Sequence, residues 1–296
     1  MPVWQRAPRP RRSTGYDRVT GVLVIGAAGK TGRAVTRALL ARGVRVRAAV
    51  RPGSQGMPYA AELASPVTVE LTTGLGLGEA MVGVDAVYHL APNVHPDEVG
   101  IATRVVESAR AAGVSRFVFH SVLHPEDASM PHHVRKAEAE KVIRTRLSTA
   151  TVLRPAAYGQ NLLDAALVGR MAVPYSIDAP FTNVDLDDVA EVAALILTGA
   201  GHAGATYELC GPESLSVREQ ARIASEVLGH PVDVSRISLE EWAAGPGSAM
   251  SEQAREDLLA MFRAYDRDGL SGDATDLERL LGRPATPWRV TLGRAA

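Results

Sequence analysis

Short apolar runs alternate with segments of helical periodicity over the first half of this 296-residue chain. The runs predict strands over residues 22–25, 44–50, 67–71, 84–90, 116–120 and 149–153. Apolar positions at helical spacing predict helices over 33–43, 101–112 and 133–147. Because strands that alternate with helices form parallel sheets with right-handed crossovers, we expect an α/β fold with a doubly wound parallel sheet and helices on both faces.

Helical patterns dominate beyond Pro155, and one strand interrupts them. The predicted helices cover residues 160–170, 187–199, 215–228, 239–244 and 251–265, the strand covers 206–210, and loops cover 245–248 and 266–269. We expect Asp187 or Asp188 to cap the helix that begins there. This half therefore predicts a smaller, mostly helical C-terminal lobe that is interleaved with the sheet.

The segment "GAAGKTGR", residues 26–33, joins the first strand to the first helix. Free N–H groups of a first helical turn, together with the helix dipole, favour a phosphate at such a junction. Gly26 suits the turn, Gly29 lets a pyrophosphate approach the backbone, and Gly32 lets the helix pack near the strand. This context predicts a dinucleotide site in a Rossmann-type domain. A strand–helix turn with incidental glycines is the alternative.

The end of the second strand indicates which dinucleotide is bound. An acidic residue there would bind the ribose 2′-hydroxyl of NAD, but this chain has Arg51, with no Asp or Glu near it. A guanidinium can hold a 2′-phosphate through two charge-assisted hydrogen bonds, and Ser54, Lys30 or Arg33 could lie close by. The sequence therefore favours NADP over NAD. The alternative is that Arg51 is one more surface arginine.

Composition excludes several classes of partner. The net charge is −1 and no apolar run approaches the ~20 residues that span a bilayer, so we expect neither a nucleic-acid nor a membrane partner. The lone cysteine, Cys210, cannot form an internal disulfide, which fits the cytoplasm; we expect a buried apolar role for it. Residues 1–19 hold five arginines and no secretory apolar segment. They are predicted to be a flexible basic extension, or else an arm that packs on the partner of a homodimer.

Several segments together resemble one protein family. "GAAGKTGR", "AAVRPGS", "GVDAVYHLAP", "SARAAGVSRFVFHSV", "LRPAAYGQNL" and "YELCGPESLSVREQARIASEVLG" occur in the order seen in NmrA-like proteins, atypical members of the short-chain dehydrogenase/reductase superfamily. The resemblance covers roughly residues 20–290. It implies an NAD(P)-binding Rossmann domain over residues 20–155 and a C-terminal substrate lobe over residues 156–296.

The resemblance also implies roles for individual residues along the cofactor. Arg51 would meet the 2′-phosphate, Ser121 would face the nicotinamide side, Lys136 would reach the nicotinamide ribose, and Pro155 with Ala156 and Ala157 would flank the ring. The remaining implied contacts are Gly26, Ala28, Gly29, Lys30, Thr31 and Gly32 at the pyrophosphate, and Leu90, Ala91 and Pro92 at the adenosine ribose. One departure concerns adenine, because residues 71–76 lack the acidic residue that many relatives have there.

A second departure concerns the proton donor. Ordinary members of the superfamily have a tyrosine four residues before the lysine, whereas this chain has His132 before Lys136. Reduction of a carbonyl needs a proton source besides the hydride donor. The candidate catalytic residues are His132, Ser121, Tyr158 and Lys136; the alternatives are a helix-start histidine, a strand-ending serine, a packed ring and a solvated lysine. The histidines lack zinc-ligand spacing, so no metal is expected.

The sequence favours an enzyme without the usual Tyr-x-x-x-Lys tyrosine. The function that we expect is an NADPH-dependent oxidoreductase acting on a small-molecule substrate, namely a small apolar or aromatic carbonyl, quinone or enone. One alternative is a non-catalytic NADP-sensing regulator, which the missing tyrosine would explain. Another is a non-redox cyclase or isomerase on the same fold.

Overall fold

The computed structural model describes residues 19–54 and 64–296, and their central feature is a seven-stranded parallel sheet. The strand order is β3-β2-β1-β4-β5-β6-β8. The strands are β1 (Gly21–Val24), β2 (Arg45–Val50), β3 (Ala64–Thr68), β4 (Ala86–His89), β5 (Arg116–His120), β6 (Thr151–Pro155) and β8 (Thr206–Leu209). The chain reverses its direction of winding between the adjacent strands β1 and β4, so the segments that follow them turn to opposite faces of the sheet and leave a crevice at the strands' carboxyl ends.

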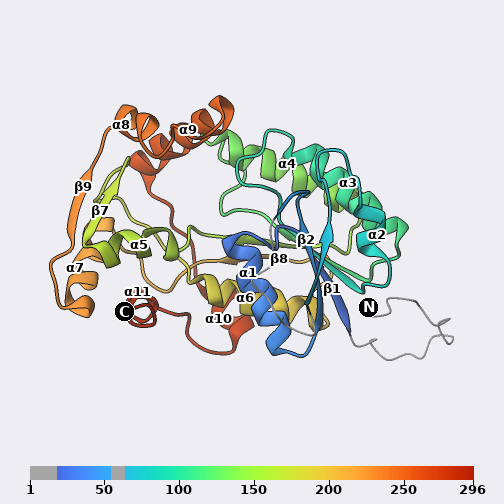
Figure 1. Ribbon diagram of the computed structural model, residues 1–296. Helices are drawn as coiled ribbons and strands as arrows, with labels where there is room; N and C mark the ends of the chain where they lie inside the picture. Colours follow the sequence, from blue (N-terminus) through green and yellow to red (C-terminus); the bar gives the residue numbers. More distant parts are fainter. Residues whose placement is uncertain (1–18, 55–63) are drawn as a thin grey trace.

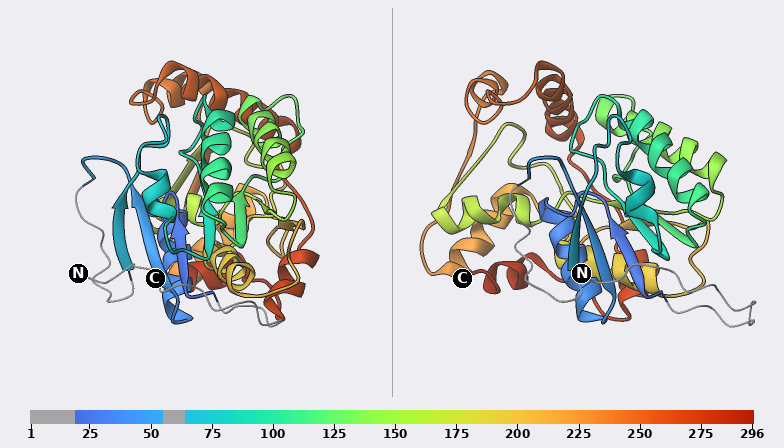
Figure 2. Two further views of the ribbon diagram at one scale, coloured as in Figure 1. Left: turned by 90° about the vertical axis from the view of Figure 1, so that its right-hand side faces the viewer. Right: turned by 45° about the vertical axis from the view of Figure 1, so that its right-hand side comes forward.

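Helices cover both faces of this sheet, as Figures 1 and 2 show. On one face α1 (Lys30–Ala41) packs beside α6 (Leu186–Thr198), and their apolar residues join the largest buried cluster. On the other face α2 (Leu77–Met81), α3 (Glu98–Ala111) and α4 (Pro131–Arg146) enclose a second cluster. The predicted doubly wound α/β fold is confirmed, and each face buries a separate part of the core.

The C-terminal lobe is built around a third apolar cluster and a small two-stranded sheet. Its elements are α5 (Gln160–Val168), β7 (Arg170–Val173), α7 (Val217–Leu228), β9 (Asp233–Arg236), α8 (Leu239–Ala244), α9 (Glu252–Asp268), α10 (Thr275–Leu281) and α11 (Trp288–Gly293). Strand β8 pairs with β6 in the main sheet, and α10 packs on α6. The lobe is therefore interleaved with the sheet.

Three local expectations were wrong. The third strand covers residues 64–68, because its pairing with β2 begins at Val46 with Ala64 and ends at Val50 with Thr68. Val69 and Leu71, at the predicted end of the strand, are buried but lie beyond this pairing. Helix α9 continues through the predicted loop to residue 268, where Gly269, with φ +68°, ends it. Asp185 caps α6 by accepting a hydrogen bond from the Asp187 amide at 2.8 Å.

The remaining predicted segments lie close to the observed ones, and their ends shift by a few residues. The predicted extension over residues 1–19 lies outside the described residues except at its last position, where Val19 is buried in the core. Within the described part of the chain, no helix has the length and apolar character to cross a bilayer.

Candidate functional site

A cavity of about 720 Å³ lies along the carboxyl ends of the parallel strands. Its walls come from the glycine turn after β1, from the segments that follow β2, β4, β5 and β6, and from α9 of the C-terminal lobe. The crevice at the carboxyl ends of β1 and β4 is thus continuous with the second lobe, in the position where doubly wound sheets bind ligands.

The glycine turn has the geometry that the sequence predicts. Gly26 has φ +79°, and Gly32 packs so closely that an added Cβ would lie 2.1 Å from the Gly26 carbonyl oxygen. A Cβ at Gly29 would instead meet only that oxygen within 4 Å, at 3.4 Å, so the protein leaves space beside it. Helix α1 begins at Lys30 without a side-chain cap, and its first amides have no intrahelical acceptor. A diphosphate fits this open, amide-lined turn.

The two ends of the turn lead to different surroundings. On one side Arg51, Ser54, Asn93 and the Leu90–Pro92 segment line the cavity, with Arg51 exposed at the end of β2. Ala28, Lys30 and Thr31 also line it. On the other side the residues after β5 and β6, including Ser121 and Pro155–Ala157, form the wall. Of the residues predicted at the cofactor, Gly32 and Arg33 do not line the cavity: Gly32 lies beneath the turn, and Arg33 Nε donates to the Ala28 carbonyl oxygen at 2.8 Å.

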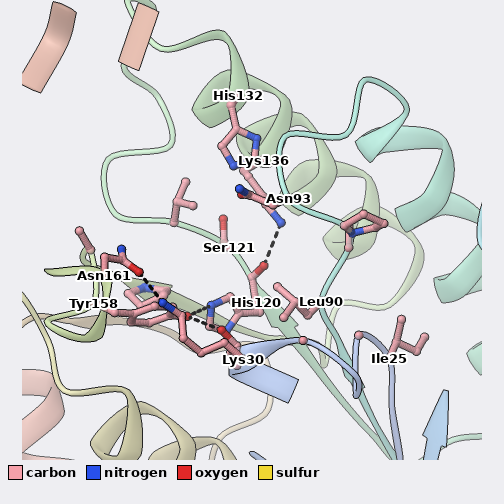
Figure 3. Close-up of a pocket in the computed structure, with 18 of the residues that line it drawn as sticks. Ile25, Lys30, Leu90, Asn93, His120, Ser121, His132, Lys136, Tyr158 and Asn161 are labelled. Atoms are coloured by element: carbon pink, nitrogen blue, oxygen red, sulfur yellow. Dashed lines mark hydrogen bonds between the residues drawn. The ribbon is translucent and has the colours of Figure 1, made fainter. Parts of the chain in front are cut away.

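Lys136 is held by an acidic partner that sequence reasoning missed. Its ammonium lies 2.9 Å from Glu98 Oε1. It also donates a hydrogen bond to the His120 carbonyl oxygen at 3.2 Å, which Figure 3 shows. The Lys136 side chain is 4% exposed and that of Glu98 is 0% exposed. Because the pair is buried at the cavity wall, Lys136 has a fixed position there instead of the freedom of a solvated helix lysine.

Ser121 belongs to a buried acidic network. Its hydroxyl donates to Glu140 Oε1 at 2.5 Å, and the Arg154 guanidinium donates to the other oxygen of Glu140 at 2.7 Å. The hydroxyl proton of Ser121 is therefore engaged by a carboxylate. A substrate oxygen could approach Ser121 only by competing with that bond.

His132 lies in the first turn of α4 and is 6% exposed. Burial, and then the charge of Lys136, lowers the pKa of His132 to about 3. Its Nδ1 atom has no hydrogen-bond partner among the described residues. The ring is consequently neutral near pH 7, so His132 cannot act as an imidazolium acid.

Tyr158 lies between the glycine turn and the end of β5. Its hydroxyl oxygen is 2.7 Å from His120 Nε2 and 3.3 Å from Thr31 Oγ1, and burial raises its pKa (Figure 3). Beside it, Lys30 Nζ donates to Asn161 Oδ1 at 2.7 Å, which joins the glycine turn to α5. His120 was not predicted as a site residue; its place at the carboxyl end of a strand was the available signal.

The far end of the cavity is apolar. Leu258, Met261 and Tyr265 of α9 line it, together with Leu123 and Leu270. These residues come from segments about 130 positions apart in the chain, and no sequence pattern indicated that they meet. They provide a surface for an uncharged apolar ligand.

Two further expectations concern chemistry outside this cavity. Cys210 is fully buried, and burial raises the pKa of its thiol to about 12, which leaves it un-ionised. In residues 19–54 and 64–296 there is no group of three His, Cys, Asp or Glu side chains that could hold a metal ion.

Known proteins share this architecture. The sequence model of the NmrA-like family matches residues 19–286. A (4-alkanoyl-5-oxo-2,5-dihydrofuran-3-yl)methyl phosphate reductase of Streptomyces griseus is 31% identical over 284 residues, covering 90% of this chain and 95% of that one. Quinone oxidoreductase 2 of Escherichia coli is 25% identical, with 90% and 95% covered. The solved triphenylmethane reductase of Citrobacter, complexed with NADP(H), has a TM-score of 0.78 and 26% identity, with 93% and 100% covered.

Proposed function

Because this chain belongs to the NmrA-like family, we propose that it is an NADPH-dependent reductase of small, uncharged carbonyl compounds, quinones or enones. The observation that carries the proposal is one continuous cavity that joins the glycine turn to the apolar wall of α9. Such a cavity can hold a dinucleotide at one end and a second, apolar molecule against its reactive ring at the other.

NADP(H) is the proposed cofactor. The glycine turn would hold its diphosphate, and Arg51 would hold the 2′-phosphate at the end of β2. Lys136 would meet the nicotinamide ribose, from a position that Glu98 fixes. Ser121 and Pro155 would border the nicotinamide. The complex of the Citrobacter reductase with NADP(H) supports this choice.

Tyr158 is the residue that we propose as hydrogen-bond donor to the substrate oxygen. When bound, NADPH supplies the hydride. Of the other candidates, Ser121 already donates to Glu140, and His132 is neutral. The raised pKa of Tyr158 keeps its hydroxyl protonated, so it can donate to an oxygen that becomes negative as hydride arrives.

The substrate class follows from the charges along the cavity. Its described lining residues include three lysines or arginines, Lys30, Arg51 and Lys136, and all of them lie toward the cofactor end. The α9 wall provides no cation for a phosphate. We therefore propose that the substrate is uncharged, although the Streptomyces relative is named for a phosphate ester.

Steady-state NADPH oxidation tests the proposal, with a naphthoquinone, a cyclic enone and a phosphorylated butenolide as acceptors. We expect turnover of the uncharged acceptors, and a kcat about 100-fold lower in Tyr158→Phe. Tyr175→Phe is the matched control, because Tyr175 is, like Tyr158, a partly buried tyrosine, but it does not line the cavity. Binding of NADPH without oxidation by any acceptor would contradict the reductase and favour a cofactor-sensing regulator. Absence of cofactor binding would favour the non-redox alternative.

A further inference from the structure

Three side chains from neighbouring strand ends form a hydrogen-bonded chain behind the cavity wall. Tyr88 Oη lies 2.5 Å from His120 Nδ1, and His120 Nε2 lies 2.7 Å from Tyr158 Oη. Tyr88 is fully buried in β4, His120 ends β5 and is 4% exposed, and Tyr158 follows β6. Only Tyr158 and His120 reach the cavity; Tyr88 lies behind them.

The donor and acceptor in each of these hydrogen bonds can be assigned by starting from Tyr88. His120 is the one hydrogen-bond partner of the Tyr88 hydroxyl among the described residues. A buried hydroxyl that does not donate costs about 1–3 kcal/mol, so Tyr88 donates to His120 Nδ1. Burial lowers the pKa of His120 to about 3, so its ring is neutral and carries one hydrogen. That hydrogen is on Nε2 and is donated to Tyr158.

We propose that Tyr88 and His120 are positioning residues that keep Tyr158 a hydrogen-bond donor toward the cavity. Since His120 donates to the Tyr158 oxygen and Thr31 Oγ1 also donates to it, at 3.3 Å, the proton of Tyr158 points at neither residue and is available to a ligand. If His120 carried its hydrogen on Nδ1 instead, Tyr158 would donate its proton to His120 Nε2, and only the hydroxyl oxygen of Tyr158 would face the cavity. The catalytic role in this inference rests on the proposed function, because it assumes that Tyr158 donates to a substrate oxygen. The tautomer itself does not depend on any substrate.

Nitrogen-15 NMR of the full chain without substrate tests the tautomer. We expect the His120 ring to show a protonated Nε2 and an unprotonated Nδ1, with the signals assigned by their loss in His120→Gln. Tyr88→Phe removes the donor to Nδ1 and should shift part of the His120 population to the Nδ1–H form. Tyr175→Phe should leave the spectrum unchanged, because Tyr175 has no contact with His120. A protonated Nδ1 in the unmodified protein would overturn the inference. That spectrum decides even if Tyr88→Phe does not fold.

Steady-state kinetics test whether this arrangement of hydrogen bonds affects catalysis by Tyr158. We expect Tyr88→Phe to lower kcat about tenfold while its KM for NADPH changes about twofold or less, because one hydrogen bond behind Tyr158 is lost and no cofactor contact changes. Equal kcat values in Tyr88→Phe and the unmodified enzyme would also overturn the inference. If Nε2 is protonated and no acceptor is reduced, the proposed reductase fails while the tautomer assignment stands.

Discussion

The buried pair of Lys136 and Glu98 makes a sharp prediction about stability. Glu98→Met and Lys136→Met each remove one charge and leave the other buried without its ion-pair partner. The double variant removes both charges and places two apolar chains of similar length in the same space. We expect each single variant to be strongly destabilised and the double variant to regain much of the loss.

The size of the expected destabilisation follows from the burial of this ion pair. The two charges lie 2.9 Å apart, at 4% and 0% side-chain exposure, and breaking such a pair costs about 3–5 kcal/mol. Glu107, on the same helix, provides the matched control. It is paired with Arg146 at 2.8 Å, but its side chain is 49% exposed. An exposed pair contributes about 0–1 kcal/mol, so Glu107→Met should differ from Glu98→Met by roughly 3 kcal/mol.

Urea unfolding without cofactor measures these differences. The midpoint should fall in both single variants at an unchanged m-value, since the area exposed on unfolding hardly changes. NADPH is left out because its binding would stabilise the folded state and hide part of the loss. The reasoning is refuted if Glu98→Met is no less stable than Glu107→Met, or if the double variant is less stable than either single one.

Three further predictions concern the cofactor and pH. Arg51→Ala should weaken NADPH binding by about 1–3 kcal/mol and NADH binding little, as measured by fluorescence titration; equal losses would contradict the 2′-phosphate contact. Gly32→Ala places a Cβ 2.1 Å from the Gly26 carbonyl and should abolish NADPH binding, whereas Gly78→Ala, where an added Cβ meets nothing within 4 Å, should not. The free energy of unfolding should fall on acidification below about pH 6.5, the pKa in the unfolded chain, because the unfolded state then binds protons that the folded state excludes down to about pH 3. Each such histidine lowers the free energy of unfolding by up to ~1.4 kcal/mol for each pH unit of acidification. Urea unfolding midpoints that do not change between pH 7 and pH 5 would refute this prediction. The histidines concerned are His89, His120 and His132.

Elements with strong periodicity could be predicted from the sequence, and short ones could not. The central strands β1, β4, β5 and β6 are largely buried on both faces and mostly apolar, so their runs are visible in the sequence, whereas no residue of the edge strand β3 is fully buried. By contrast, β7 and β9 are four residues each, and half of β7 is exposed. Their pairing depends on contact between residues 170–173 and 233–236, which no local pattern encodes.

The same distinction applies to the site. The glycine turn could be predicted because its requirements are local: a positive φ at Gly26 and a close approach at Gly32. Arg51 was found from its position after a predicted strand. Glu98 could not be found, because it is an ordinary acidic residue at the start of a helix until α3 and α4 pack together. Its importance arises from a tertiary contact that buries it against Lys136.

The packing around α4 explains why His132 cannot take the place of the missing tyrosine as a proton donor. His132 and Lys136 lie one turn apart at the start of this helix, and both are buried. Burial, and then the charge of the adjacent Lys136 ammonium, opposes protonation of His132, so this ring has no positive charge to lose as an acid near pH 7. Tyr158 approaches the cavity from β6 instead, where Thr31 and His120 contact its hydroxyl. In the proposed reductase, the hydrogen-bond donor therefore lies on the side of the glycine turn and not on the α4 side of the cavity. The proposal thus requires that hydride transfer be served by a donor that follows β6 and not by one on α4.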